Sequence, residues 1–177
     1  MPVLKQATLF AMEPEPNPSR MATSATFVDN LRLPVHRWVR YSAGFSAEWA
    51  QSVIRESESR RTMRVFDPFA GSGTTLLAAE QVGVECCGVE AHPFVSRMAE
   101  AKLAWRSDPE AYRALVKKIK ATASDFVTDL SGYPKLIREC FDDETLTTLD
   151  GLRQAVVRHD DASPAAKLAW LPLMAIL

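Results

Sequence analysis

The chain has 177 residues, of which 47% are hydrophobic and 24% are charged, a composition typical of one soluble globular domain. The 21 basic and 22 acidic residues nearly cancel, which excludes a protein that binds nucleic acid by overall charge. No signal peptide opens the chain, and no apolar run approaches the ~20 residues that span a bilayer. Three free cysteines, without a metal site, favour a cytoplasmic location.

The first 25 residues are predicted to be a disordered tail, because prolines alternate with polar residues in "MEPEPNPSR", and Met21 is a second candidate start. Ser46 is predicted to cap a helix over "AEWAQSVIRE". The apolar face of that helix is expected to consist of Trp49, Ala50, Val53 and Ile54.

The pattern then predicts a strand in "RRTMRVFDPF", a glycine turn, a helix over "TTLLAAEQV" ended by Gly83, a strand in "VECCGVE" and a helix over "HPFVSRMAEAKLAW". This β-α-β-α order indicates an α/β fold with parallel strands. Cys86 and Cys87 are expected to be buried free thiols, and Cys140 to lie in the core.

Residues 107–177 are predicted to be helical. A capping box with Ser107 and Glu110 is expected to open a helix. Its apolar stripe is Tyr112, Leu115, Val116, Ile119, Phe126, Val127 and Leu130. Lys117, Lys118 and Lys120 lie off that stripe and form either a solvated face or a phosphate-facing surface. A helix weakened by Gly151 follows, and Ser163 caps a last helix that Pro172 interrupts.

The glycine turn "DPFAGSGTT" carries the functional signal. Gly71 and Gly73 permit positive φ and let a ligand approach bare backbone. The third glycine of the dinucleotide pattern is replaced by Leu76, and the turn has no phosphate-binding lysine. Asp67 at the strand tip suits a cationic ligand, while Glu90 at the next strand tip suits a ribose diol. S-Adenosylmethionine fits this description, because it has a ribose and a cationic end but no pyrophosphate.

"DPFAGSGTT" followed by "GVEAHPFVSRMAEAKL" resembles the cofactor motif of DNA methyltransferases that modify amino groups of adenine or cytosine. The upstream "LPVHRWVRYSAGFSAEW" resembles the segment of those enzymes that closes over the methionine end of the cofactor. The resemblance covers roughly residues 30–105 and implies an incomplete Rossmann-like fold that binds S-adenosylmethionine. We expect residues 26–106 to form this region, and residues 107–177 a helical segment.

The resemblance also implies the contacts of the cofactor. The methionine end would be surrounded by Asp67, Pro68, Phe69, Gly71, Gly73 and Thr74, with Phe45 and Ser46 from the upstream segment. The ribose would be bound by Glu90, and the adenine bordered by Pro93 and Phe94. His36 is read either as a structural histidine or as a base, and Trp38 and Tyr41 either cover the sheet edge or stack on a nucleobase. His92 is either solvated or functional.

Enzymes of this family carry a second motif, an Asp, Asn or Ser followed by Pro-Pro and an aromatic residue, which binds the flipped-out target base. None of the 11 prolines here is adjacent to another. We therefore expect the chain to be the first part of a larger methyltransferase, cut short or split between two chains, and inactive alone. DNA is the expected substrate of the complete enzyme. The alternatives are a fragment of an RNA guanine methyltransferase and a non-catalytic subunit of a split enzyme.

Overall fold

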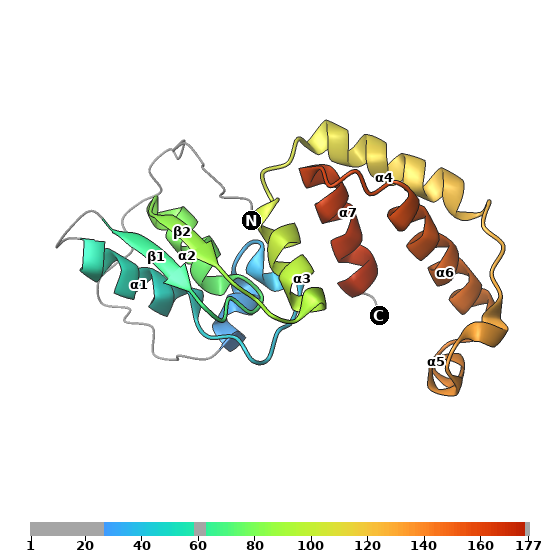
Figure 1. Cartoon of the computed structure of the whole chain (residues 1–177), viewed down its shortest axis with the longest axis horizontal. Helices are drawn as coiled ribbons and strands as arrows, with labels where there is room; N and C mark the ends of the chain where they lie inside the picture. Colours follow the sequence, from blue (N-terminus) through green and yellow to red (C-terminus); the bar gives the residue numbers. More distant parts are fainter. Residues whose placement is uncertain (1–26, 59–62, 176–177) are drawn as a thin grey trace. The chain divides into compact units, whose positions relative to one another are not determined.

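A computed structural model describes residues 27–58 and 63–175. The expected tail and the alternative start at Met21 lie outside the described residues. The chain divides into two compact units, residues 1–103 and residues 104–177. Figure 1 labels the helices and strands of both units.

The first unit contains a two-stranded parallel sheet with helices, in agreement with the predicted α/β class. Two 3-10 helices, η1 (Phe27–Arg32) and η2 (His36–Trp38), precede helix α1 (Ala47–Glu58). Strand β1 (Arg64–Asp67), helix α2 (Thr74–Val82), strand β2 (Glu85–Gly88) and helix α3 (Pro93–Leu103) follow. The strands pair from Arg64 with Glu85 to Asp67 with Gly88, so α2 is the crossover of a β-α-β unit.

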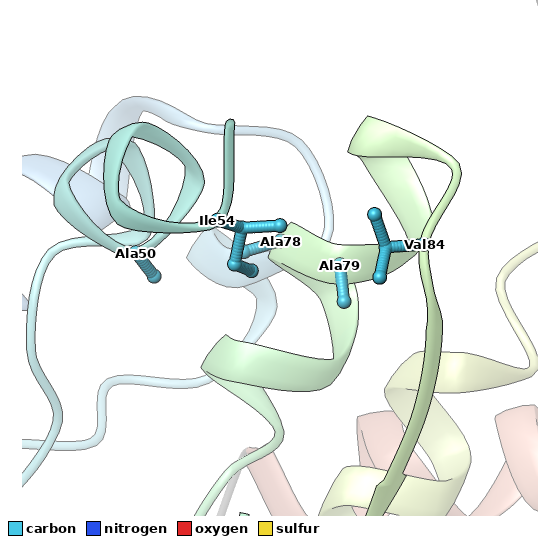
Figure 2. Close-up of a cluster of buried hydrophobic side chains, with 5 residues drawn as sticks. All are labelled: Ala50, Ile54, Ala78, Ala79 and Val84. Atoms are coloured by element: carbon cyan, nitrogen blue, oxygen red, sulfur yellow. The ribbon is translucent and has the colours of Figure 1, made fainter. Parts of the chain in front are cut away.

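The core of this unit lies between α1, α2 and one face of the sheet. Figure 2 shows its buried side chains, Ala50, Ile54, Ala78, Ala79 and Val84. The small alanines of α2 let α1 approach closely, and Val65 and Cys86 of the strands pack against the same cluster. Ser46 caps α1 as predicted, because its Oγ accepts a hydrogen bond from the Trp49 N–H. Trp49 and Val53, however, are exposed, so the buried face of α1 is narrower than predicted.

The opposite face of the two strands is exposed within the described residues. Phe66 keeps 61% of its surface accessible, and Cys87, its partner in the strand register, is also exposed. The prediction that both thiols of the Cys86–Cys87 pair are buried is therefore wrong, because side chains alternate across a strand. Cys86 lies on the covered face, where burial, and next the negative charge of Glu80, raise the pKa of its thiol to about 11.

The second unit is helical, as predicted. It contains α4 (Pro109–Ala123), the 3-10 helix η3 (Leu130–Gly132), α5 (Lys135–Cys140), α6 (Asp143–Arg158) and α7 (Pro164–Ala175). Its core joins Ile119 of α4, Ala155 and Val156 of α6, and Ala169 of α7. The Ser163 Oγ accepts a hydrogen bond from the Ala166 N–H, which confirms the predicted cap of α7.

Several details of the second unit differ from prediction. The N-cap of α4 is Asp108 rather than Ser107, because Pro109 occupies the first helical position and the Asp108 carboxylate accepts hydrogen bonds from two backbone N–H groups. The helix ends at Ala123, and Val127 beyond it is 94% exposed. Cys140 ends the short α5 and is exposed. Helix α7 continues through Pro172.

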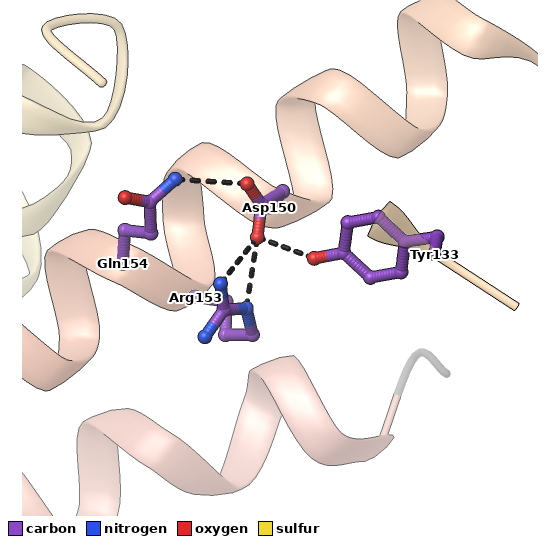
Figure 3. A network of polar contacts seen from close by, with 4 residues as sticks. All are labelled: Tyr133, Asp150, Arg153 and Gln154. Atoms are coloured by element: carbon purple, nitrogen blue, oxygen red, sulfur yellow. Dashed lines mark hydrogen bonds and ion pairs between the residues drawn. The ribbon is translucent and has the colours of Figure 1, made fainter. Parts of the chain in front are cut away.

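A buried carboxylate joins η3 to α6 in this unit. Asp150 is only 5% exposed and accepts hydrogen bonds from the Tyr133 hydroxyl, the Arg153 guanidinium and the Gln154 amide (Figure 3). Burial alone would raise the pKa of Asp150, but the hydrogen bonds from Tyr133 and Arg153 outweigh it and lower that pKa. Every contact of Asp150 is internal, which gives it a structural role.

Gly151, expected to weaken α6, instead permits close packing of α6 on α4. A Cβ at position 151 would lie 2.5 Å from the Ala123 carbonyl oxygen, a backbone atom that cannot move without shifting the end of α4. We expect Gly151→Ala to lower the free energy of unfolding of this unit by about 1–2 kcal/mol, in spite of the better helix propensity of alanine. Urea denaturation followed by circular dichroism measures this effect. Gly132→Ala, where a Cβ meets open space, is the control.

Within the described ranges, none of the helices is long and apolar enough to cross a membrane. The same residues contain no group of three or more His, Cys, Asp or Glu side chains placed to hold a metal ion.

Candidate functional site

A cavity of about 170 Å³ opens at the carboxyl ends of the two strands, where the glycine turn meets the segment before α1. Parallel sheets bind ligands at this end of their strands. The lining residues are Tyr41, Ala43, Gly44, Phe45, Phe69, Ala70, Gly71, Ser72, Thr74 and Glu90. Segments about 20 residues apart in sequence therefore contribute to one cavity.

The glycine turn between β1 and α2 has the left-handed backbone that its sequence predicts. Gly71 and Gly73 have φ angles of 51° and 83°, in the left-handed region that favours glycine. A Cβ at Gly73 would also lie 3.3 Å from the Ala99 Cβ of α3, so the turn packs directly on that helix. The Asp67 Oδ1 accepts a hydrogen bond from the Phe69 N–H at 2.9 Å and stabilises the entry to the turn.

Glu90 connects the ends of both strands. Its Oε2 accepts a hydrogen bond of 2.9 Å from the Gly71 N–H, and its Oε1 accepts one of 2.9 Å from the His92 N–H. A carboxylate oxygen has two lone pairs, so each oxygen of Glu90 can still accept one further hydrogen bond. Glu90 thus holds the turn in place and keeps acceptor capacity for a ligand in the cavity.

The upstream segment, with Tyr41, Ala43, Gly44 and Phe45, forms a second wall of the cavity. The Tyr41 ring lies close to Gly71, since a Cβ at Gly71 would come within 3.4 Å of it. Asn30, which is fully buried, fixes this wall: its Nδ2 donates to the Phe45 carbonyl, and its Oδ1 accepts from the Ala47 N–H, each at 2.8 Å. The wall is thereby connected to the start of α1.

Comparison with known proteins identifies a family for part of the chain. Residues 14–101 match the family described as DNA methylase. This part of the chain belongs to the DNA methylase family. We call residues 14–101 the methylase segment, of which the structure describes 27–58 and 63–101.

Curated relatives are type II methyltransferases. The chain is 39% identical over 65 residues to M.BsoBI of Geobacillus stearothermophilus, a match that covers 37% of this chain and 13% of the relative. It is 34% identical over 77 residues to M.AvaI of Nostoc sp. (strain PCC 7120 / SAG 25.82 / UTEX 2576), covering 44% of this chain and 16% of the relative. The matched part of the chain thus spans about one seventh of the length of these relatives. No solved structure matches the chain significantly.

The methylase segment brings five of the predicted site residues to the cavity, namely Phe45, Phe69, Gly71, Thr74 and Glu90. The other predicted residues are not among those that line it: Ser46, Asp67, Pro68, Gly73, Pro93 and Phe94. Ser46 is buried as the cap of α1, and Gly73 is the N-terminal cap residue of α2. Asp67 and Pro68 directly precede the lining residues of the turn. Pro93 and Phe94 begin α3 and are exposed.

The sequence did not single out five further lining residues, Tyr41, Ala43, Gly44, Ala70 and Ser72, as cofactor contacts. Each lies within four residues of a predicted contact, so proximity in the sequence was the available signal. For Tyr41 the sequence allows two roles, covering the sheet edge or stacking on a nucleobase, and the structure places it on the cavity beside Gly71. Trp38 is 38% exposed, and His92 is exposed with its ring edge-on to Phe94.

Two buried basic side chains lie behind the glycine turn. His36 is fully buried, and neither ring nitrogen has a hydrogen-bond partner among the described residues. Burial, and secondarily the charge of Lys102, lower the pKa of His36 to about 4. Lys102 of α3 is also fully buried, and its Nζ donates to the Ser72 Oγ at 3.4 Å. Burial lowers the pKa of Lys102 to about 8. His36 is therefore neutral at pH 7, as a structural histidine would be, while Lys102 remains charged.

Proposed function

We propose that this chain binds S-adenosylmethionine and serves as the cofactor-binding part of a DNA methyltransferase that methylates an exocyclic amino group of adenine or cytosine. The single observation that supports this most strongly is the convergence of the glycine turn and Glu90 on one cavity at the strand ends. On this proposal, residues 27–103 are part of a Rossmann-like methyltransferase fold, and their two strands are neighbours in its parallel sheet.

The residues at the cavity fit the chemical groups of this cofactor. The two unoccupied lone pairs of Glu90 match the two hydroxyls of a ribose. Bare backbone at Gly71 leaves room that a Cβ would fill against Tyr41. When bound, the cofactor supplies an electrophilic methyl group on a sulfonium centre. The contribution of this chain is to hold and orient the cofactor: Glu90 at the ribose, and Asp67 and the glycine turn at the cationic methionine end.

Methyl transfer to DNA needs further groups that accept hydrogen bonds from the target amine and stack on the base. The 177 residues contain no Pro-Pro pair with which to form the expected motif. We therefore propose that these 177 residues bind the cofactor without transferring methyl groups by themselves, and that the groups that bind the target base are supplied from outside them. An RNA guanine methyltransferase is not favoured, since the matched family is described as DNA methylase. A cytoplasmic location stays a prediction.

Isothermal titration of the purified chain with S-adenosylmethionine tests the proposal. We expect one site per chain, and no transfer of radioactive methyl groups to unmethylated DNA by the chain alone. Absence of binding at millimolar ligand would refute the assignment of the cavity. Transfer of methyl groups by these 177 residues alone would refute the proposed need for groups from outside them.

The role of Asp67 is tested by Asp67→Asn, which keeps an oxygen to accept from the Phe69 N–H but removes the negative charge. We expect affinity for S-adenosylmethionine to fall about 10-fold, because the cationic end of the ligand loses its counter-charge. Asp129→Asn is a matched control, since Asp129 makes the same kind of bond to the Ser131 N–H in the helical unit. Equal affinities of Asp67→Asn and wild type would remove Asp67 from the site.

A further inference from the structure

Lys102 has an unusual environment for a lysine. Lysine side chains normally extend their ammonium group into water, and a buried ammonium is costly unless an anion lies beside it. Lys102 is fully buried, yet no carboxylate of the described residues lies within ion-pair distance of it. Its hydrogen bond to the neutral Ser72 hydroxyl is long, at 3.4 Å. The ammonium therefore has unused capacity for an anion.

His36 provides an independent observation at the same place. Both nitrogens of its buried ring lack a hydrogen-bond partner among the described residues, and its electrostatic neighbour is Lys102. Buried polar groups in folded proteins almost always have partners. The interior behind the glycine turn thus contains one cation, Lys102, beside a neutral imidazole without hydrogen-bond partners, and no described negative charge to match the cation.

Ser72 connects this interior to the cavity, because it lines the cavity and also contacts Lys102. An ammonium has three donors and no acceptor, so the Ser72 oxygen must accept from Lys102. The hydroxyl hydrogen of Ser72 is then available for an acceptor elsewhere. A hydroxyl that accepts from a cation is also polarised toward donating, and a carboxylate is the acceptor that such a donor binds best.

Both negatively and positively charged side chains therefore lie at or near the cavity. Glu90 lies on the cavity, and Asp67 precedes the turn, whereas the Lys102 ammonium lies behind Ser72. This distribution matches an amino acid head group, which has an ammonium and a carboxylate on one carbon. Burial lowers the pKa of Lys102 only to about 8, so the ammonium remains charged at pH 7.

We propose that Lys102, acting through the Ser72 hydroxyl, positions the carboxylate of the ligand and makes the cavity selective for ligands with an amino acid end. The inference rests on the proposed function, since it assigns one end of S-adenosylmethionine. Lys102 is a positioning residue here, while Ser72 makes the contact.

Two ligands separate this role from a structural one. S-Adenosylhomocysteine has the amino acid end, whereas 5′-methylthioadenosine has the same adenosine and thioether but lacks it. We expect Lys102→Met and Ser72→Ala each to weaken S-adenosylhomocysteine binding about 10-fold, the effect of one charge-assisted hydrogen bond, and to leave the methylthioadenosine Kd within about 2-fold. The double variant is expected to bind as weakly as either single variant, because the two residues act in series.

Isothermal titration calorimetry on the full chain measures the Kd of S-adenosylhomocysteine and the Kd of 5′-methylthioadenosine. Lys118→Met, which removes an exposed lysine of α4, is the control and should bind both ligands as wild type does. Equal weakening of both ligands in the variants, or no weakening of S-adenosylhomocysteine, overturns the inference while leaving the proposed function intact. Failure of the wild-type chain to bind either ligand instead overturns the proposed function. If Lys102→Met does not fold, the same comparison of the two ligands in Ser72→Ala tests the inference, since that substitution removes only a hydroxyl.

Discussion

Glu90→Ala is expected to reduce affinity for S-adenosylmethionine by at least about 100-fold, the largest effect of any single substitution at the cavity. Two losses combine. The ligand loses an acceptor for its ribose hydroxyls, and hydrogen bonds to a charged group contribute about 1.5–3 kcal/mol each. The protein also loses the hydrogen bonds that hold Gly71 and His92 at the strand ends, so the turn no longer has its bound geometry before the ligand arrives.

Glu90→Gln separates these two contributions. The amide oxygen can replace one carboxylate oxygen and keep the 2.9 Å bond to the Gly71 N–H, but only one strong acceptor remains. We expect an intermediate loss of about 10-fold by calorimetry, and amide exchange at Gly71 that stays close to that of wild type. Glu48→Ala, in the first turn of α1, serves as an exposed control. Wild-type affinity in Glu90→Ala would show that the ligand does not use this carboxylate.

Acidification is expected to destabilise the first unit through His36. The pKa of this histidine falls from 6.5 to about 4 in the folded chain, because the ring is buried and lies near the charge of Lys102 in α3. Between these two values the unfolded state binds more protons than the folded state, so stability falls as the pH is lowered from 6.5 to 4. The difference in pKa corresponds to about 3 kcal/mol, lost in full only below pH 4.

His36→Leu provides the comparison, because it removes the titrating group and the two nitrogens that lack partners. We expect this variant to be at least as stable as wild type at pH 7, and to lose about 3 kcal/mol less on going to pH 4. Urea denaturation in a Trp105→Phe, Trp170→Phe background reports on the first unit alone, through Trp38 and Trp49. If the free energy of unfolding falls equally with pH in wild type and in His36→Leu, His36 does not cause the loss of stability in acid.

Local chemistry made much of the methylase segment predictable from the sequence. Helix α2 begins and ends where the glycines place it, since Gly73 and Gly83 both adopt left-handed backbone that other residues avoid. Ser46 caps α1 for an equally local reason. The position of Glu90 beside the turn followed from the parallel β-α-β order, in which neighbouring strand ends meet. These features depend on a few adjacent residues and one general rule of topology.

Features that depend on tertiary packing were not predictable in the same way. The sequence gives no sign that Lys102 is buried behind Ser72, because a lysine in an amphipathic helix is normally solvated. The close approach of α6 to Ala123 reversed the interpretation of Gly151, from a weak point in a helix to a packing requirement. At Asp108 two local signals competed, and proline in the first turn decided which residue caps the helix.

The hydrogen bonds of Glu90 have a consequence for selectivity between sugars. A carboxylate has four lone-pair positions, and in the free protein two of them are already used by the Gly71 and His92 N–H groups. The two remaining lone-pair positions can accept hydrogen bonds from a sugar with two adjacent hydroxyls. A sugar with a single hydroxyl at this place would leave one of the two positions without a donor. On the proposed function, Glu90 therefore favours ribose, which offers two adjacent hydroxyls, over deoxyribose, which offers one. The sugars of a DNA strand cannot satisfy both positions, so a DNA substrate would not compete with the cofactor for this carboxylate.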